Sequence, residues 1–496
     1  MGLSGVTPGN RDELKSRRMS LAARSADQLT QGQTGWSILP SHSASYFATA
    51  LIMPNLSLLN ALAQSFLAGE QNVEQVIARG SRTLGKPWRW LRPLAKRYVE
   101  IFASGRRPRP RHRDVVVFLL HDRGMAQVQS KYFRELFVQQ RLTEPQQMQP
   151  VAAAKMWDVP AIESFGALAE WLGLTPSELQ WFADLKGLGY RKSSQQLRHY
   201  HYQVLVKRSG NIRLIEAPKP RLKELQRQIL SAILEKIPPH PAAQGFLKGR
   251  SIKTFVAPHV GRRVVLRMDL RDFFPTFGGA RIQTLFRTMG YPESVADLLG
   301  GICTNAAPRS AWKKPAFDVD PGHLWEARAL YTRPHLPQGA PTSPALANLC
   351  SYRIDCRLAG LAKSVSAKYT RYADDLAFSG SETLERCVER FSTQVAAILL
   401  EEGFAVHHRK TRIMRQGVRQ HLAGLVANQH LNVIRADFDR FKAILTNCVR
   451  LGPESQNREA HPHFRSHLEG RVGFVEMINP VKGKRLRAIF EQIQWK

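Results

Sequence analysis

The 496-residue sequence is poor in cysteine and in long apolar runs. A chain of this length does not need disulfides for stability, and an odd number of thiols without a C-x-x-C pair favours a reducing, cytoplasmic location. No apolar run reaches the roughly 18 to 20 residues needed to cross a bilayer, because Pro54, Asn55 and Asn60 interrupt the stretch from 45 to 69. The first 30 residues also lack the apolar segment of a secretory signal. The five cysteines are Cys303, Cys350, Cys356, Cys387 and Cys448.

Acidic residues are also scarce relative to basic ones. Lys and Arg total 72 against 40 Asp and Glu, which gives a formal charge of +32. Such a balance indicates a polyanionic partner, because neutralising phosphates releases counterions and supplies affinity for nucleic acid. An anionic membrane surface is the alternative, but the sequence shows no basic amphipathic anchor or lipidation signal. We therefore expect a nucleic-acid partner and no membrane association.

The sequence pattern changes three times along the chain. Residues 1–50 show no periodicity and are expected to form a disordered tail. Residues 51–190 repeat apolar residues at helical spacing, and residues 191–415 mix strand and helix patterns. Residues 416–496 return to helical spacing and are strongly basic. This succession predicts an α+β protein with an N-terminal helical region.

The segment "RYADDLAFSG" places Asp374 and Asp375 side by side between two short predicted strands. Asp is a preferred turn residue, so the pair could simply be solvated. However, Leu376 and Phe378 alternate onto one face, which indicates a half-buried hairpin. Two acids on a buried hairpin need a compensating cation, and Mg²⁺ prefers carboxylate oxygens.

A third acid, Asp269, closes the apolar run "RRVVLRMDL", which is typical of a buried central strand. If this strand lies beside the Asp374–Asp375 hairpin in one antiparallel sheet, three carboxylates converge. Such a set can hold two metal ions about 3.5 to 4 Å apart and supports in-line phosphoryl transfer with pyrophosphate as the leaving group. The chemistry predicted from these residues is nucleotide polymerisation.

"RYADDLAFSG", "MDLRDFFPTF" and "LPQGAPTSPALANL" together resemble the reverse transcriptases. The stretch from about 200 to 496 resembles the bacterial retron-type branch, also in "VLVKRSGNIRLIEAPKPRLKELQRQIL", "GFLKGRSI", "EEGFAVHHRKTRIM" and "RQHLAGLVAN". The resemblance implies a right-hand polymerase with fingers and palm at 191–415, a basic helical thumb at 416–496 and an N-terminal helical extension.

The resemblance also implies roles for the acids. Asp269, Asp374 and Asp375 would bind two Mg²⁺ ions, with Mn²⁺ as a substitute, and the backbone carbonyl of Leu270 would be a further ligand. Phe274 falls where the family keeps a bulky side chain under the incoming sugar. Such a ring would exclude a 2′-hydroxyl, so the expected substrates are deoxynucleoside triphosphates. The alternative is that Phe274 is ordinary core.

Three further positions and one loop match residues that contact substrate in the family. Gln338 and Gly339 correspond to a loop beneath the nascent base pair, although a Pro-rich turn before a helix is common. Lys207 and Arg213, on the two arms of a predicted β-hairpin, correspond to residues that grip the triphosphate. Lys410 corresponds to a position near the phosphates. Each of these basic residues could instead be a solvated surface charge.

The function implied by the resemblance is RNA-directed DNA synthesis on the protein's own structured RNA. Synthesis would start from a 2′-hydroxyl in this RNA and give a branched, RNA-linked DNA. The resemblance also implies a role in antiphage defence and an effector protein as a partner. Four departures leave the lineage open. "FVAPH" keeps only His259 of an Asn-Ala-x-x-His element, and a Val-Thr-Gly element reads Leu422-Ala423-Gly424. Gln244 and His407 stand where relatives commonly have His and Asn. The alternatives are a group II intron-like or stand-alone defence reverse transcriptase with another primer, and a non-catalytic RNA-binding scaffold.

Overall fold

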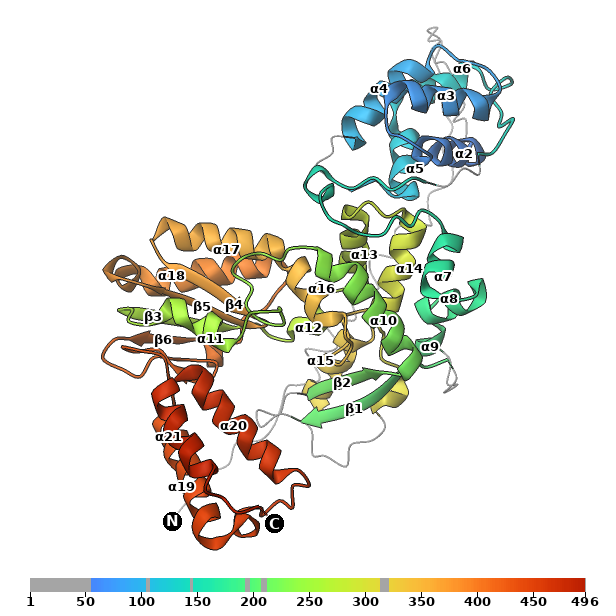
Figure 1. Ribbon diagram of the computed structural model, residues 1–496. Helices are drawn as coiled ribbons and strands as arrows, with labels where there is room; N and C mark the ends of the chain where they lie inside the picture. The colour runs from blue at the N-terminus through green and yellow to red at the C-terminus, as the bar shows by residue number, and fades with distance from the viewer. Residues whose placement is uncertain are drawn as a thin grey trace, which may run out of the picture. The chain divides into compact units, whose positions relative to one another are not determined.

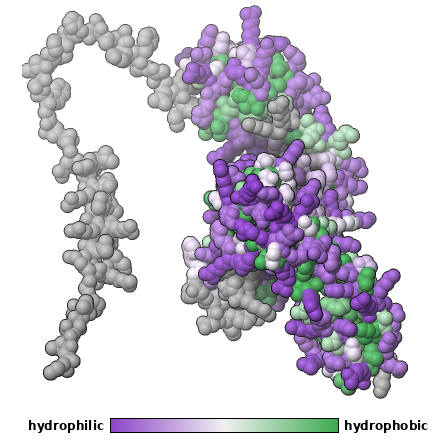
Figure 2. Space-filling view, turned by 90° about the vertical axis from the view of Figure 1, so that its left-hand side faces the viewer, coloured by the Kyte–Doolittle hydropathy of each residue, from purple (hydrophilic) through white to green (hydrophobic). Residues whose placement is uncertain are grey.

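The computed structural model describes residues 55–103, 108–142, 146–191, 197–206, 212–312 and 321–495 of a mixed α and β protein (Figure 1). All of them belong to one structural unit, Pro54–Lys496. None of the helices in these ranges is both long and apolar enough to cross a bilayer. The tail predicted for residues 1–50 lies outside the described residues. Hydrophilic residues cover most of the face in Figure 2, as the composition leads one to expect.

A four-stranded antiparallel sheet lies at the centre of the site-bearing part. Its strand order is β4-β5-β3-β6. The bounds are β3 Val264–Asp269, β4 Lys368–Tyr372, β5 Asp375–Gly380 and β6 Arg412–Arg415. The helices α17 (Tyr352–Ser364) and α18 (Glu382–Glu401) lie over one face of this sheet (Figure 1). The strand predicted to end at Asp269 and the two strands predicted around Asp374 are therefore confirmed.

The strands of this sheet bury side chains on both faces, in two different cores. On β3, Leu266 and Met268 belong to the larger core, whereas Val265 belongs to a second one. On β5, Phe378 and Ala377 divide in the same way. This follows from the period-2 alternation of a strand, which sends successive side chains to opposite faces.

The larger core lies between the sheet and the helices α17 and α18 and extends into a further group of helices. Six of these helices contribute buried side chains to it, among them those of Leu168, Leu225, Phe286 and Leu299. These helices are α7 (Phe165–Leu172), α8 (Pro176–Ala183), α10 (Pro220–Ala232), α13 (Gly279–Thr288), α14 (Glu293–Cys303) and α16 (Ser343–Cys350). The second core is formed with the short helix α11 (Ile252–Val256), the small sheet β7 (His421–Leu422), β8 (Leu425–Val426) and β9 (Asn432–Val433), and the helices α19 (Arg435–Leu451), α20 (Phe464–Ile478) and α21 (Pro480–Phe490).

A separate hairpin and a separate helical core complete the described chain. The hairpin pairs β1 (Tyr200–Val206) with β2 (Ile212–Pro218), as predicted, and its turn lies outside the described residues. Next to β2 lies α15 (Pro321–Tyr331), and Leu214 and Tyr331 share a small core there. The N-terminal core contains α2 (Leu56–Leu67), α3 (Val73–Leu84), α4 (Leu91–Phe102), α5 (His112–His121) and α6 (Arg123–Lys131).

Candidate active site

The β4–β5 hairpin presents its two acids at a tight turn. Tyr372 pairs with Asp375, so Ala373 and Asp374 form a two-residue loop. Ala373 has φ = +53°, at the loop position where type II′ hairpins favour Gly. Left-handed backbone at a non-Gly residue costs on the order of 1 kcal/mol and is concentrated at functional sites. The turn thus accepts local strain to hold Asp374 beyond the strand ends.

Strand β3 brings the third acid to the same place. Asp269 pairs directly with Asp375 in the antiparallel ladder between β3 and β5. The backbone N–H of Leu270 donates to the carbonyl oxygen of Asp374 at 2.9 Å. Paired residues of antiparallel strands point to the same face, with Cβ atoms about 5 Å apart. The predicted neighbourhood of these two elements is confirmed.

A cavity of about 340 Å³ collects most of the predicted site residues. All three acids line it, together with Leu270 and Phe274. Its other described lining residues are Arg213, Phe246, Arg271, Asp272, Phe273, Pro275, Tyr331, Gln338, Tyr372, Ala373, His407, Lys410 and Ala423. Eight residues predicted from separate stretches of sequence therefore meet in one concave site, which is where ligands are expected to bind.

Two basic side chains hold two of the carboxylates. Lys410 donates from Nζ to both oxygens of Asp269, at 2.9 and 3.0 Å. Arg267 donates from Nη2 and Nε to Oδ1 of Asp375, at 2.7 and 3.0 Å. Arg267 stands two residues before Asp269, so strand alternation places both on one face. This alternation was the one sequence signal that could have identified Arg267, which the sequence analysis missed.

Asp374 carries the least compensated charge of the three. Burial, followed by repulsion from Asp269 and Asp375, raises the pKa of the Asp374 carboxyl. Burial also raises the pKa of Asp375, and the Arg267 guanidinium opposes that rise. Clustered acids with raised pKa values in a cavity are typical of a functional site. A further cation near Asp374 would relieve the repulsion.

The donor chemistry of this site fits a hard divalent cation. Carboxylate oxygens and a backbone carbonyl are the ligand types that Mg²⁺ prefers, and it commonly shares them with substrate phosphates. Within the described ranges, however, no group of three or more His, Cys, Asp and Glu side chains is arranged as a metal site. Here Lys410 and Arg267 take the places beside Asp269 and Asp375. Binding of an ion would require these carboxylates to turn from their basic partners.

A buried ion pair anchors the hairpin behind its acids. Arg371, the first residue of the motif, donates from Nε and Nη2 to the two oxygens of Asp355 on α17, at 2.8 and 2.6 Å. Arg371 and Asp355 are 1% and 0% exposed. The Tyr369 hydroxyl donates to Asp355 at 2.8 Å, and Arg371 Nη1 donates to Asn348 at 3.0 Å. This network fixes β4 to α16 and α17 and so fixes the position of the turn.

The Gln338–Gly339 loop lies against β2 on a second buried network. Glu216 donates its backbone N–H to the Gln338 carbonyl at 2.8 Å. The Glu216 carboxylate accepts from Asn305 Nδ2 at 2.7 Å and contacts His335 Nε2 at 2.8 Å. Gly339 has φ = +132°, and a Cβ there would lie 2.8 Å from the Glu216 carbonyl oxygen. The close approach of the loop therefore requires Gly.

The remaining predicted residues differ in where they lie. Phe273 and Phe274 both line the cavity, but Phe273 is buried in the larger core, whereas Phe274 is half-buried and packs against that core. Arg213 lies on β2, is exposed and lines the cavity. Lys207 lies outside the described residues. Gly339 supports the site through backbone packing and is not among the lining residues.

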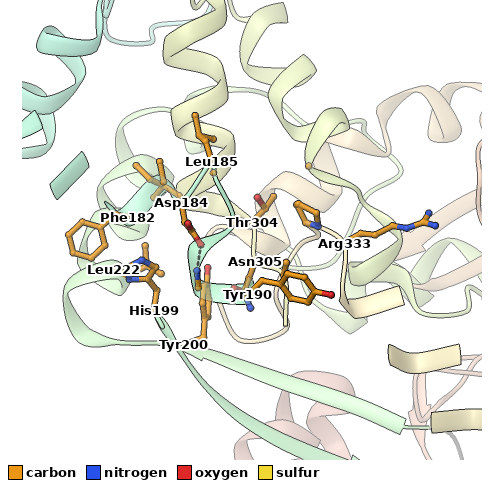
Figure 3. A pocket seen from close by; sticks show the side chains of 18 of the residues that line it. Phe182, Asp184, Leu185, Tyr190, His199, Tyr200, Leu222, Thr304, Asn305 and Arg333 are labelled. Atoms are coloured by element: carbon orange, nitrogen blue, oxygen red, sulfur yellow. Dashed lines mark hydrogen bonds between the residues drawn. The ribbon is translucent and has the colours of Figure 1, made fainter. Parts of the chain in front are cut away.

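A second pocket, of about 480 Å³, contains none of these acids. Figure 3 shows Phe182 and His199 on one side of it and Arg333 on the other. Burial lowers the pKa of His199, whose ring contacts the Trp181 carbonyl at 2.8 Å. Its lining residues include members of α8, α10, β1, α13 and α14 as well as loop residues such as His199 and Arg333. The candidate chemistry thus belongs to the smaller cavity that contains the carboxylates.

Comparison with known proteins places these observations in a family. Residues 205–433 match the family model described as reverse transcriptase (RNA-dependent DNA polymerase). Over 309 residues the chain is 42% identical to the Retron Mx65 reverse transcriptase of Myxococcus xanthus, covering 61% of this chain and 66% of that protein. It is 36% identical to the Retron Mx162 reverse transcriptase of the same organism, over 67% of each chain. The chain belongs to the retron reverse transcriptases.

More distant members of this family also match the chain. The Retron Ec86 reverse transcriptase of Escherichia coli is 28% identical over 302 residues, which cover 60% of this chain and 82% of that protein. The match to each Myxococcus retron reverse transcriptase spans about two thirds of that protein's length. The predicted resemblance to retron reverse transcriptases, a family of RNA-dependent DNA polymerases, is therefore confirmed.

Proposed function

We propose that this retron reverse transcriptase is an active RNA-directed DNA polymerase that extends DNA from deoxynucleoside triphosphates. The observation that carries the proposal is the meeting of Asp269, Asp374 and Asp375 in one cavity with Lys410 and Arg213. A triphosphate substrate requires acids that hold the metal ions and basic groups that bind its phosphate oxygens. In this reading the four-stranded sheet belongs to the palm, the β1–β2 hairpin to the fingers and residues 416–496 to the thumb.

The three acids and the Leu270 carbonyl would hold two Mg²⁺ ions, or Mn²⁺ in their place, which would activate the attacking hydroxyl and stabilise the pyrophosphate leaving group. Arg213 and Lys410, with Lys207, would bind the triphosphate oxygens. Lys410 is half-exposed, and Asp269 is its only ion-pair partner among the described residues, so Lys410 can transfer from that carboxylate to a phosphate.

The residues around the sugar and base would select the substrate. Phe274 stands in the cavity beside the acids, and its ring would fill the space of a ribose 2′-hydroxyl. Gln338 would contact the nascent base pair, held in place by the Glu216 backbone. We propose Phe274 as the position that discriminates deoxynucleotides from ribonucleotides.

We further propose that the template is the protein's own structured RNA and that the product is a branched, RNA-linked single-stranded DNA. Family membership and the formal charge of +32 support this assignment. A cytoplasmic location, a role in antiphage defence and an effector protein partner complete the proposal. The rival function is reverse transcription that starts from another primer.

The test is to purify the protein from cells carrying its native flanking DNA, beside an Asp374→Asn, Asp375→Asn variant. Bound nucleic acid is extracted and treated with RNase or DNase. A short DNA joined covalently to RNA, found only with both acids intact, is the expected result. Bound RNA without attached DNA, from protein that still extends an added primer, would contradict the proposed branched product and leave the polymerase activity standing. If the unmodified protein did not extend an added primer, the result would favour the non-catalytic scaffold.

A further inference from the structure

The N-terminal helical core carries a pocket of about 460 Å³ that the polymerase site does not use. The loop between α3 and α4 and the C-terminal end of α6 form its walls. We propose that this pocket, called here the aromatic-basic pocket, binds single-stranded nucleic acid. The inference deepens the proposed function, on which it rests, by giving the N-terminal helices a template or product strand to hold. The residues that define the pocket are Lys86, Trp88, Arg89, Trp90, Lys131 and Tyr132.

The aromatic rings form a platform anchored from behind. Trp88 meets Tyr132 edge-on at 4.9 Å between ring centroids and lies 6.2 Å from Trp90. All three rings are half-buried and pack on the N-terminal core. Rings fixed in this way lose little entropy when a base stacks on them, and every base has a π-face that can do so. The platform therefore suits a strand whose bases are unpaired.

The charges of the pocket are all of one sign. None of its described lining residues is acidic. Lys86 pairs at the rim with exposed Glu135 at 3.3 Å, a contact between two solvated groups that contributes little. Arg89 and Lys131 are exposed and form no ion pair with any residue in the described ranges. Cations that lack acidic partners are available for phosphates.

Lys86 connects the two features. Its ammonium lies 3.9 Å from the centroid of Trp88, and the Lys131 ammonium lies 5.3 Å from the centroid of Tyr132. A cation over such a ring is held less strongly than a stacked base. A base can therefore take the place over Trp88 while Lys86 moves to the adjoining phosphate. Double-stranded RNA, which proteins recognise through its grooves and backbone, would leave the rings unused.

Photocrosslinking to the full-length protein tests the inference at the level of residues. The probes are oligouridylate with 4-thiouridine and oligothymidylate with 4-thiothymidine, each about 10 nucleotides long, and phosphatidylserine vesicles for a sedimentation arm. Arg89→Glu, Lys131→Glu removes two cations of the pocket. The matched control, Lys96→Glu, Arg113→Glu, reverses two exposed charges of α4 and α5 outside it.

We expect crosslinks in the peptides that carry Trp88, Trp90 or Tyr132, and their loss in the Arg89→Glu, Lys131→Glu variant but not in the control. The slope of log affinity against log salt should fall by about 1.4 for two lost phosphate contacts. Trp88→Leu should weaken binding about 5- to 140-fold for one stacked base. Crosslinking by the RNA probe, by the DNA probe or by both supports the inference and identifies the strand.

Absence of crosslinks in these peptides would overturn the inference, as would equal losses in the two charge-reversed variants. If the Arg89→Glu, Lys131→Glu variant lost vesicle binding but bound nucleic acid as well as the unmodified protein does, the inference would be overturned in favour of a membrane surface. Extension of a short primer by the unmodified protein reports the polymerase separately. A protein that extends primers but shows no crosslink at the pocket would refute only this inference, and one that crosslinks without extending would refute only the proposed activity.

Discussion

Removing the acid behind the hairpin turn should destabilise the protein far more than removing an exposed acid. Asp355→Ala leaves the guanidinium of Arg371 without its bidentate partner, at a position where Arg371 is 1% exposed. Breaking a buried pair from one side costs about 3 to 5 kcal/mol, because the remaining charge is not solvated. Loss of the Tyr369 hydroxyl contact to Asp355 adds about 1 kcal/mol. We expect a loss of about 4 to 6 kcal/mol in the free energy of unfolding.

The assay is urea unfolding followed by circular dichroism, with two comparison variants. Glu389→Ala removes an exposed acid that pairs with Arg415 and should leave the urea midpoint close to that of the unmodified protein. The double variant Asp355→Leu, Arg371→Met removes both charges and should be less destabilised than Asp355→Ala. A loss below about 1 kcal/mol for Asp355→Ala, or a double variant as unstable as the single one, would refute the reasoning.

Three further predictions concern the cavity and its supports. Gly339→Ala places a Cβ 2.8 Å from the Glu216 carbonyl oxygen at φ = +132° and should abolish most primer extension, which an unaltered rate would contradict. Burial and the neighbouring carboxylates raise the pKa of Asp374, so its ionised form destabilises the fold. Asp374→Asn should therefore raise the urea midpoint at pH 7 in chelator, and the gain should vanish as the pH falls below about 3.9; a gain independent of pH would contradict this. Glu216→Gln weakens the contact to His335 and should lower deoxynucleotide incorporation while preserving RNA binding, as filter binding and extension assays can show.

The sequence was sufficient to predict features that depend on local pattern. Alternation predicted the strand that ends at Asp269 and the strands around Asp374, and the register between them follows from burying Leu266 and Phe378 on the same face. Helical periodicity likewise predicted the N-terminal and C-terminal helices. These patterns are short-range and recur every two or four residues.

Features that join distant segments could not be predicted in this way. Glu216 and His335 are 119 residues apart and meet only because the loop before Gln338 folds onto β2. Asp355 reads as one more acid on an amphipathic helix until Arg371 is placed beside it. The pairing of Lys410 with Asp269 links positions 141 residues apart. Such pairs depend on tertiary packing, for which neither residue carries a local signal.

The sheet that bears the acids is a partition between two hydrophobic interiors. Val265, Ala377 and Met414 face the interior shared with α19, α20 and α21, while their neighbours along the strands face the other. A protein cut after Arg415 would leave one side of this partition open to water. The C-terminal helices therefore cannot be treated as a detachable module, because a protein without them would expose an apolar face of the sheet to water. Engineers who seek a smaller polymerase should expect aggregation from such truncation.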